Sequence, residues 1–130
     1  MHSLPTRRVA LTLLAHPDDA EILCAGTLIR LADAGWEIHI ATVANGDCGT
    51  TVYSREEIAR IRKAEGIAGA AVIGATYHCL EEGDLNVAYS KETIRKTLDL
   101  FREVAPTLLF AHPRHDYMID HEQAHLLARG

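Results

Sequence analysis

The chain has 130 residues, of which 48% are hydrophobic and 24% are charged, and its formal net charge is -5. This length and composition are typical of one soluble globular domain and are too small for two. The acidic balance excludes the basic surface with which proteins bind nucleic acids or anionic membranes, so we expect neither as a partner.

The predicted elements alternate between strand and helix from the start of the chain. A near-continuous apolar run at residues 8–15 predicts a first strand, and the helix after it ends at Gly35. A second run at residues 37–44 predicts a second strand covered on both faces. Apolar side chains spaced three and four residues apart predict the inward face of the first helix: Ala20, Cys24, Leu28 and Leu31.

The second helix is predicted to begin at a capping box, in which Glu57 follows Ser54 by three residues, and to end at Gly74. A third strand is then predicted at residues 75–80. We expect the inward stripe of the second helix to consist of Ile58, Ile61, Ala64, Ala68 and Ala71.

A polar loop at residues 81–89 leads to a third helix, which begins near Ser90 and cannot continue through Pro106. Its predicted inward residues are Ile94, Leu98 and Phe101. A fourth strand is predicted at residues 107–111. The last ten residues, HEQAHLLARG, are typical of the opening turns of a helix, so we expect the chain to be truncated at its C terminus.

This alternation predicts an α/β fold: a Rossmann-like open, mostly parallel sheet with helices on both faces. We expect residues 1–130 to form a single domain, incomplete at the C terminus. Three widely spaced cysteines without a CxxC pair indicate a reducing compartment, and we expect a cytoplasmic protein. The apolar part of the N-terminal segment is too short for a signal peptide or a membrane span.

Polar clusters follow the first and fourth predicted strands, at residues 16–19 and 112–121. In open α/β sheets, ligands bind beyond the carboxyl ends of the strands, where the strand order reverses. If the two strands are neighbours, as the usual doubly wound orders have them, the two clusters converge on one site.

The residue types in these clusters favour a metal site. His16 and Asp19, three residues apart across a strand-to-helix turn, can direct two ligand atoms at one ion, and His121 would supply a third. Three such ligands and a water molecule are typical of catalytic Zn²⁺, although Fe²⁺ fits the same ligand types. Asp18 is placed to act as a general base toward that water, and Asp120 to orient a histidine from behind.

Simpler interpretations remain open for each residue. Either Asp18 or Asp19 could cap the following helix, and His121 could be a solvated loop residue. The segment at residues 45–49, NGDCG, lacks the spacing of a phosphate-binding loop and is more typical of an ordinary turn, with Cys48 an ordinary loop thiol.

At these residues the sequence resembles the PIG-L/LmbE-like family of zinc-dependent N-acetylglucosaminyl deacetylases. The family stretch A-H-P-D-D-x-E is matched by residues 15–21, and its H-x-D-H element by residues 118–121, where Met118 replaces the first histidine. The resemblance implies His16, Asp19 and His121 as zinc ligands and Asp18 as the base.

The resemblance also implies that Arg62, in an R-x-x-E element, contacts substrate hydroxyl or phosphate groups, although a plain Arg62–Glu65 surface pair is an alternative. The family histidine that Met118 replaces polarises the substrate carbonyl. His115, His112 or a residue beyond the present C terminus could take that role, and we assign His115 to substrate binding.

We therefore expect a metal-dependent hydrolase that removes an acetyl group from an N-acetylated amino sugar or its conjugate, through a metal-bound water activated by Asp18. Two alternatives are a hydrolase of another amide or ester, and a non-catalytic sugar- or metal-binding relative, which Met118 favours and Asp18 disfavours. A flavodoxin-type response domain would leave His16 and His121 unexplained. The expected partner is a small molecule, and a homo-oligomer is left open.

Overall fold

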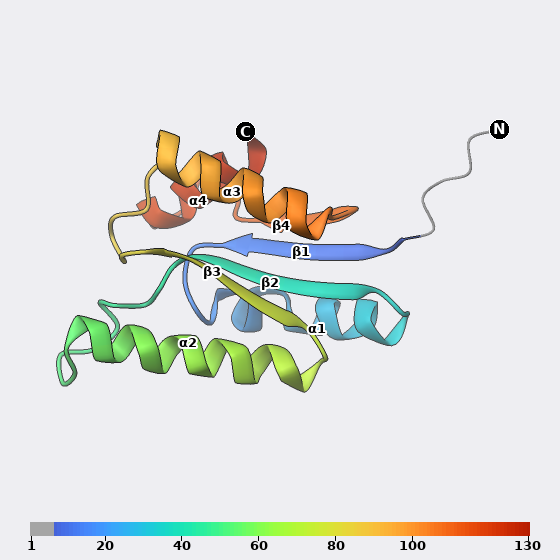
Figure 1. The fold of residues 1–130 in the computed structure, drawn as a ribbon, viewed down its shortest axis with the longest axis horizontal. Helices are drawn as coiled ribbons and strands as arrows, with labels where there is room; N and C mark the ends of the chain where they lie inside the picture. The colour runs from blue at the N-terminus through green and yellow to red at the C-terminus, as the bar shows by residue number, and fades with distance from the viewer. Residues whose placement is uncertain (1–6) are drawn as a thin grey trace.

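A computed structural model describes residues 7–130, so part of the N-terminal segment considered above, residues 1–6, lies outside it. Strands and helices alternate along the described chain, and each predicted strand is present within two residues of its expected ends (Figure 1). The strands are β1 (Val9–Leu14), β2 (Glu37–Ala44), β3 (Thr76–Glu82) and β4 (Leu108–Ala111). The helices are α1 (Asp19–Asp33), α2 (Arg55–Val72), α3 (Lys91–Val104) and α4 (Ile119–Arg129).

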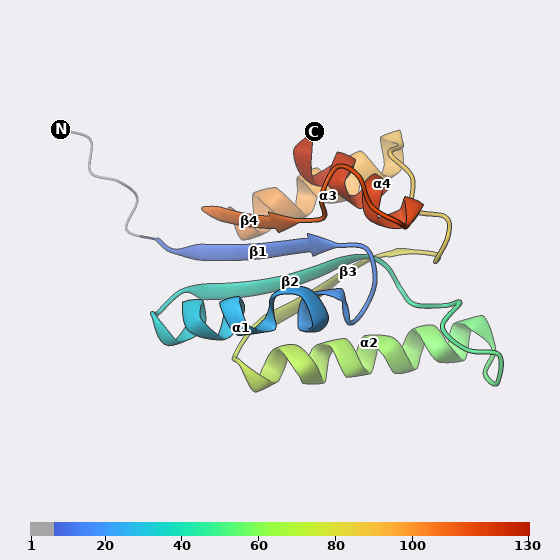
Figure 2. The same ribbon diagram turned by 180° about the vertical axis from the view of Figure 1, so that it is seen from behind.

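The four strands form one parallel sheet in the order β3-β2-β1-β4. Helices α1 and α2 cover one face, and α3 and α4 cover the other, as the two opposite views show (Figures 1 and 2). The predicted α/β fold, with its parallel sheet and helices on both faces, is confirmed. Every residue of β1 is buried because this central strand has a helical layer on each side.

Each helical layer encloses its own apolar core. Leu11 and Leu13 of β1 face the core under α3 and α4, whereas Leu14 faces the core under α1 and α2. In α1, the predicted inward residues Ala20 and Leu28 are buried in that second core, with Cys24 and Leu31 packed against it.

The inward face of α2 differs from the prediction. Ala64, Ala68 and Ala71 are exposed, and the buried residues are Ile58, Gly66 and Ala70. The reason is close packing against β3: a Cβ atom added to Gly66 would lie 2.7 Å from Cζ of Tyr77. The helix therefore turns its smallest residue toward the Tyr77 ring, which apolar spacing alone does not reveal.

The inward face of α3 is also partly different. Leu98 is 46% exposed, whereas Thr93 and Thr97 are buried beside Leu100 and Val104. The Thr97 hydroxyl donates to the backbone carbonyl of Thr93 at 2.8 Å, so its burial leaves no unpaired polar group.

The helix caps are partly as predicted. The Ser54 side chain accepts a bond from the Glu57 backbone at 3.2 Å, but only this half of the expected capping box forms. A complete box joins Ser90 and Thr93 at the start of α3. Among the residues that the structure describes, none of the helices combines the length and apolar character needed to cross a lipid bilayer.

Candidate metal centre

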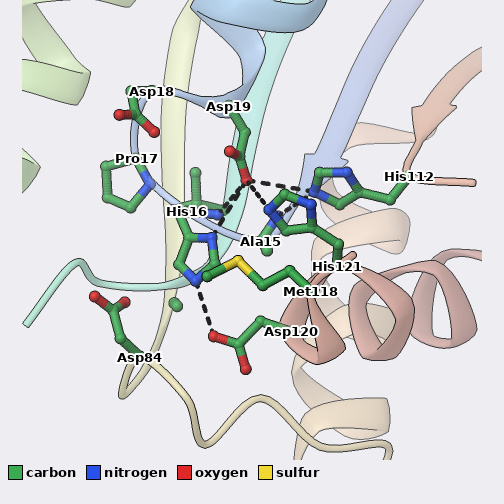
Figure 3. Close-up of polar contacts among 12 residues, drawn as sticks. Ala15, His16, Pro17, Asp18, Asp19, Asp84, His112, Met118, Asp120 and His121 are labelled. Atoms are coloured by element: carbon green, nitrogen blue, oxygen red, sulfur yellow. Dashed lines mark hydrogen bonds and ion pairs between the residues drawn. The ribbon is translucent and has the colours of Figure 1, made fainter. Parts of the chain in front are cut away.

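The predicted site residues meet at the carboxyl ends of β1 and β4, which are neighbours in the sheet. The strand order reverses here, because β2 and β3 lie on one side of β1 and β4 lies on the other. An open cleft of about 920 Å³ runs across this edge. His16, Asp19 and His121 line it together, as Figure 3 shows.

Asp19 is the centre of the cluster. Its Oδ2 atom accepts a bond from the His16 backbone N–H at 2.8 Å, and lies 3.5 Å from Nδ1 of His16 and 3.4 Å from Nε2 of His121. Burial alone would raise the pKa of this carboxyl group, but the side chains of His112 and His16 and the His16 backbone N–H outweigh it and hold the pKa well below its usual range. Asp19 is therefore an ionised ligand candidate.

His16 is oriented from behind by a second carboxylate. Its Nε2 atom lies 2.8 Å from Oδ2 of Asp120, which leaves Nδ1 facing Asp19. Burial alone would lower the pKa of His16, but the bonds with Asp19 and Asp120 raise it to about 9. Asp120 also accepts the backbone N–H of Leu85 at 2.8 Å, so the β3–α3 loop fixes its position.

His121 lies in the first turn of α4 and is held in the same manner. Its Nδ1 atom lies 3.0 Å from Oδ1 of Asp116, which leaves Nε2 facing Asp19. Asp116 is not among the site residues predicted from the sequence. The sequence feature that could have indicated Asp116 is its position two residues before Met118, because an aspartate there favours a tight turn before a helix. The structure contains that turn, with the Met118 backbone N–H 3.1 Å from Asp116 Oδ1.

The donor set fits a tetrahedral zinc ion. The ligand atoms of His16, Asp19 and His121 all lie within 4.8 Å of one another. Ligands about 2.1 Å from a tetrahedral zinc lie about 3.4 Å apart, close to the separations of 3.4 and 3.5 Å around Asp19. Two imidazole nitrogens and one carboxylate suit Zn²⁺, and also Fe²⁺.

His112 is a further member of the cluster. It is buried, its ring is stacked on His121 with centroids 3.9 Å apart, and its Nε2 atom lies 3.3 Å from Asp19. The backbone N–H of Ala15 donates to that same Nε2 at 3.0 Å, so its lone pair is already engaged. Nδ1 of His112 is buried without a partner among the described residues. From the sequence, His112 is predicted only as a possible substitute for the family histidine that Met118 replaces.

Asp18 and Arg62 also line the cleft. Asp18 is the N-cap residue of α1, but its side chain makes no capping bond, so the alternative capping role is wrong for Asp18. Its half-exposed carboxylate instead lies 3.1 Å from Nη2 of Arg62. Arg62 also donates to the Pro17 carbonyl and to Glu65, each at 2.7 Å. The predicted Arg62–Glu65 pair is therefore present, but it is part of a network that reaches the candidate base.

A second loop network supports the cleft from the side of β2. The buried Asp84 accepts the backbone N–H groups of Gly46 at 2.9 Å and Cys48 at 3.0 Å, and its own N–H donates to Asp47. This carboxylate ties the β3–α3 loop to the β2–α2 loop. The NGDCG segment is thus an ordinary turn, as expected, although its backbone is held in place by hydrogen bonds to Asp84.

His115 lies apart from these residues. His115 is exposed and does not line the cleft. It belongs to a turn in which the side chains of His112 and Asp116 are directed inward and that of His115 is not. Met118 does line the cleft beside His16 and His121 (Figure 3). A thioether has no proton to donate, so the position held by a histidine in the family motif offers no hydrogen-bond donor here.

The fold and this site define an α/β domain with a two-histidine, one-carboxylate centre at the switch point of a parallel sheet. The profile of the PIG-L family, described as GlcNAc-PI de-N-acetylase, matches residues 11–130. The chain belongs to the PIG-L family.

Three known proteins illustrate the range of the similarity. Diacetylchitobiose deacetylase of Thermococcus kodakarensis is 30% identical over 97 residues, covering 72% of this chain and 36% of that protein. The 4-oxalmesaconate hydratase of Pseudomonas putida is 25% identical over 131 residues, covering 95% and 51%. The structure of N,N'-diacetylchitobiose deacetylase from Pyrococcus horikoshii, in complex with an inhibitor, superposes with a TM-score of 0.87 at 29% identity, covering 95% and 48%. The chain thus spans about half the length of the hydratase and of the solved deacetylase.

Proposed function

We propose that this chain takes part in metal-dependent hydrolysis of the acetamide group of an N-acetylated amino sugar or its conjugate. The observation that carries the proposal is the arrangement of His16 and His121 around the buried, ionised Asp19, with Asp18 on the same turn. Similarity to two diacetylchitobiose deacetylases supports the substrate class. Zinc held by these three residues would supply a Lewis acid that lowers the pKa of water and polarises a carbonyl group.

The remaining chemistry belongs to side chains of the cleft. Asp18, half-exposed at the cleft wall, would take a proton from the attacking water and return it to the departing amine. Arg62 would hold the Asp18 carboxylate in place and present its guanidinium group to substrate hydroxyls. Asp120 would keep Nδ1 of His16 directed at the centre.

The predicted role of His115 in substrate binding stays a proposal with little support, because the residue is exposed and outside the cleft. Nε2 of His112 already accepts the Ala15 N–H. A donor for the oxyanion would therefore come from another group at the cleft.

The base assignment is tested by Asp18→Asn. We expect this variant to bind zinc as the wild type does and to release acetate from N-acetylglucosamine oligomers about 10²–10⁴-fold more slowly, the usual contribution of a general base. His121→Ala serves as the matched variant, because it should lose zinc itself, measured by elemental analysis. Near-wild-type turnover by Asp18→Asn would disprove the role of Asp18.

A second candidate is the addition of water to an unsaturated organic acid, the type of reaction in the name of the Pseudomonas putida relative. Met118 favours it, because the cleft lacks the donor that the deacetylase interpretation requires. The charge of the cleft opposes it: its described lining contains four carboxylates, and its single Arg or Lys side chain, Arg62, is already paired. These side chains favour a neutral acetamido sugar over an anionic substrate, although the charge of a bound metal ion would offset part of this effect.

The two candidates are separated by their products. We expect acetate release from the neutral N-acetyl sugar and no loss of ultraviolet absorbance from a conjugated unsaturated dicarboxylate. The reverse pattern would establish the hydratase function instead.

A further inference from the structure

Both ring nitrogens of His121 face a carboxylate. Nε2 lies 3.4 Å from Asp19, and Nδ1 lies 3.0 Å from Asp116. His121 is shared by two groups of candidate ligands, one with His16 and Asp19 and the other with His112 and Asp116, and the carboxylate of each group faces a different ring nitrogen. A neutral imidazole has only one lone pair, so the position of its proton decides which group His121 can serve.

The position of Asp116 determines that proton. Its side chain is 11% exposed, and Oδ1 also accepts the Met118 backbone N–H, so the turn before α4 fixes the carboxylate. An ionised carboxylate can only accept hydrogen bonds. Of the two carboxylates that face the ring, Asp116 makes the shorter contact, 3.0 Å against 3.4 Å for Asp19. The hydrogen of the neutral ring therefore lies on Nδ1, which leaves the lone pair on Nε2, facing Asp19.

His112 cannot serve the second group in this arrangement. Its Nε2 lone pair accepts the Ala15 N–H, so the proton of the neutral ring lies on Nδ1. With its Nε2 lone pair engaged, its Nδ1 protonated and its ring stacked on His121 at an interplanar angle of 8°, His112 supports the position of His121 without offering a ligand atom.

We propose that Asp116 is a positioning residue that keeps His121 in the Nδ1–H tautomer and so directs metal binding to the site formed with His16 and Asp19. It acts on His121 as Asp120 acts on His16, with the two nitrogens exchanged. The inference rests on the metal site of the proposed function, but not on the reaction or on the substrate.

The tautomer of His121 gives the first test. Long-range ¹H–¹⁵N NMR of the metal-free wild type, at a pH where the ring is neutral, should show the proton on Nδ1. In Asp116→Ser, whose hydroxyl can still accept the Met118 N–H and keep the turn, a substantial fraction should move to Nε2. A wild-type ring protonated on Nε2 would overturn the proposal, and this outcome requires no variant to fold.

Zinc affinity, measured by competition with a chelator, gives the second test. Loss of a carboxylate behind a ligating histidine weakens metal binding by about 10–100-fold, and we expect a loss of this size in Asp116→Ser. Asp99→Ser, which removes an exposed carboxylate from α3, should leave the affinity unchanged. Wild-type affinity in folded Asp116→Ser would refute the proposal.

These measurements are independent of turnover. If neither acetamides nor unsaturated acids are converted while Asp116→Ser shifts the tautomer and weakens zinc binding, the proposed function fails and the role of Asp116 stands.

Discussion

Adjacent aspartates in the first βα turn have different environments. Asp19 is buried, and its pKa is held below the usual range by His112 and His16, against the opposing effect of burial. Asp18 is half-exposed at the cleft wall and has a backbone φ of 102°, a left-handed conformation that costs a non-glycine residue of order 1–3 kcal/mol. The turn thus directs the carboxylate of Asp19 inward as a ligand candidate and holds the carboxylate of Asp18 in the cleft.

The positive φ of Asp18 predicts that glycine at this position would make the fold more stable than another residue that lacks the carboxylate. We expect Asp18→Gly to be more stable than Asp18→Asn by about 1 kcal/mol, because glycine adopts positive φ without steric cost. Both variants lose the ion pair with Arg62, and the asparagine amide could still accept a hydrogen bond from Arg62, so a more stable glycine variant would report the backbone term against that bond. Denaturant unfolding of the two metal-free variants measures it. Equal stabilities would show that the strain of the turn does not exceed the contribution of that bond.

The individual residues also mark the limit of the sequence prediction. His16, Asp19 and His121 could be predicted because their side-chain types follow strands that were expected to be neighbours. Asp116 and the stacking of His112 could not, because both depend on how the turn before α4 folds. Closeness in sequence to Met118 predicts His115 as a substrate-binding residue, but in the folded turn His115 is exposed to solvent.

The strands and helices were predictable as elements, but the rotation of a helix about its axis was less so. The inward face of α1 was predicted correctly from the spacing of Ala20, Cys24, Leu28 and Leu31, although Ile22 and Leu23 of the same helix are exposed. In α2, alanines on several sides carry little information, and contact between Gly66 and the Tyr77 ring decides the face instead. In α3, threonines that bond within their own helix replace Leu98 on the inward side.

This packing predicts opposite effects of alanine at two glycines of α2. Gly66→Ala gains helix propensity of about 1 kcal/mol, but its Cβ atom would lie 2.7 Å from the Tyr77 ring, which the bond to Thr42 at 2.8 Å holds in place. Since overpacking costs about 1–3 kcal/mol, we expect a net loss of stability. The added Cβ atom in Gly69→Ala meets only the flexible end of Glu21, at 3.1 Å, and should be neutral or stabilising by up to about 1 kcal/mol.

Denaturant unfolding of both glycine variants provides the measurement. A stabilised Gly66→Ala would mean that the ring of Tyr77 moves freely, and that the inward face of α2 is not determined by this contact.

At the scale of the whole molecule, the strand order assembles the site. The order β3-β2-β1-β4 brings residues about a hundred positions apart in sequence to one edge, where Asp120 contacts His16. From the sequence, the convergence of the two polar clusters depended on the condition that the first and fourth strands are neighbours, as in the usual doubly wound orders, and the structure meets that condition. The loops that support it, such as the Asp84 bridge between two βα connections, depend on tertiary contacts that carry no local signal.

The charge arrangement of the site predicts a pH dependence of stability for the metal-free chain. Burial lowers the pKa of His16, but the bonds with Asp19 and Asp120 outweigh it and raise this pKa from 6.5 to about 9. The protonated form of His16 therefore stabilises the fold. This contribution is complete below pH 6.5 and is lost as the pH rises through 9. With a chelator present, we expect the free energy of unfolding to fall across this range, and to fall less in His16→Gln.

Zinc should reverse this slope, because a ligating histidine must release its proton. Between pH 6.5 and 9, deprotonation of His16 becomes easier, so zinc affinity should rise, and with it the stabilisation, which is about 2.7 kcal/mol when the free ion is 100 times its dissociation constant. Unfolding midpoints in a zinc buffer and in a chelator should therefore diverge as the pH increases. Parallel curves would mean that zinc does not bind through His16, and His16→Gln should make the two curves coincide.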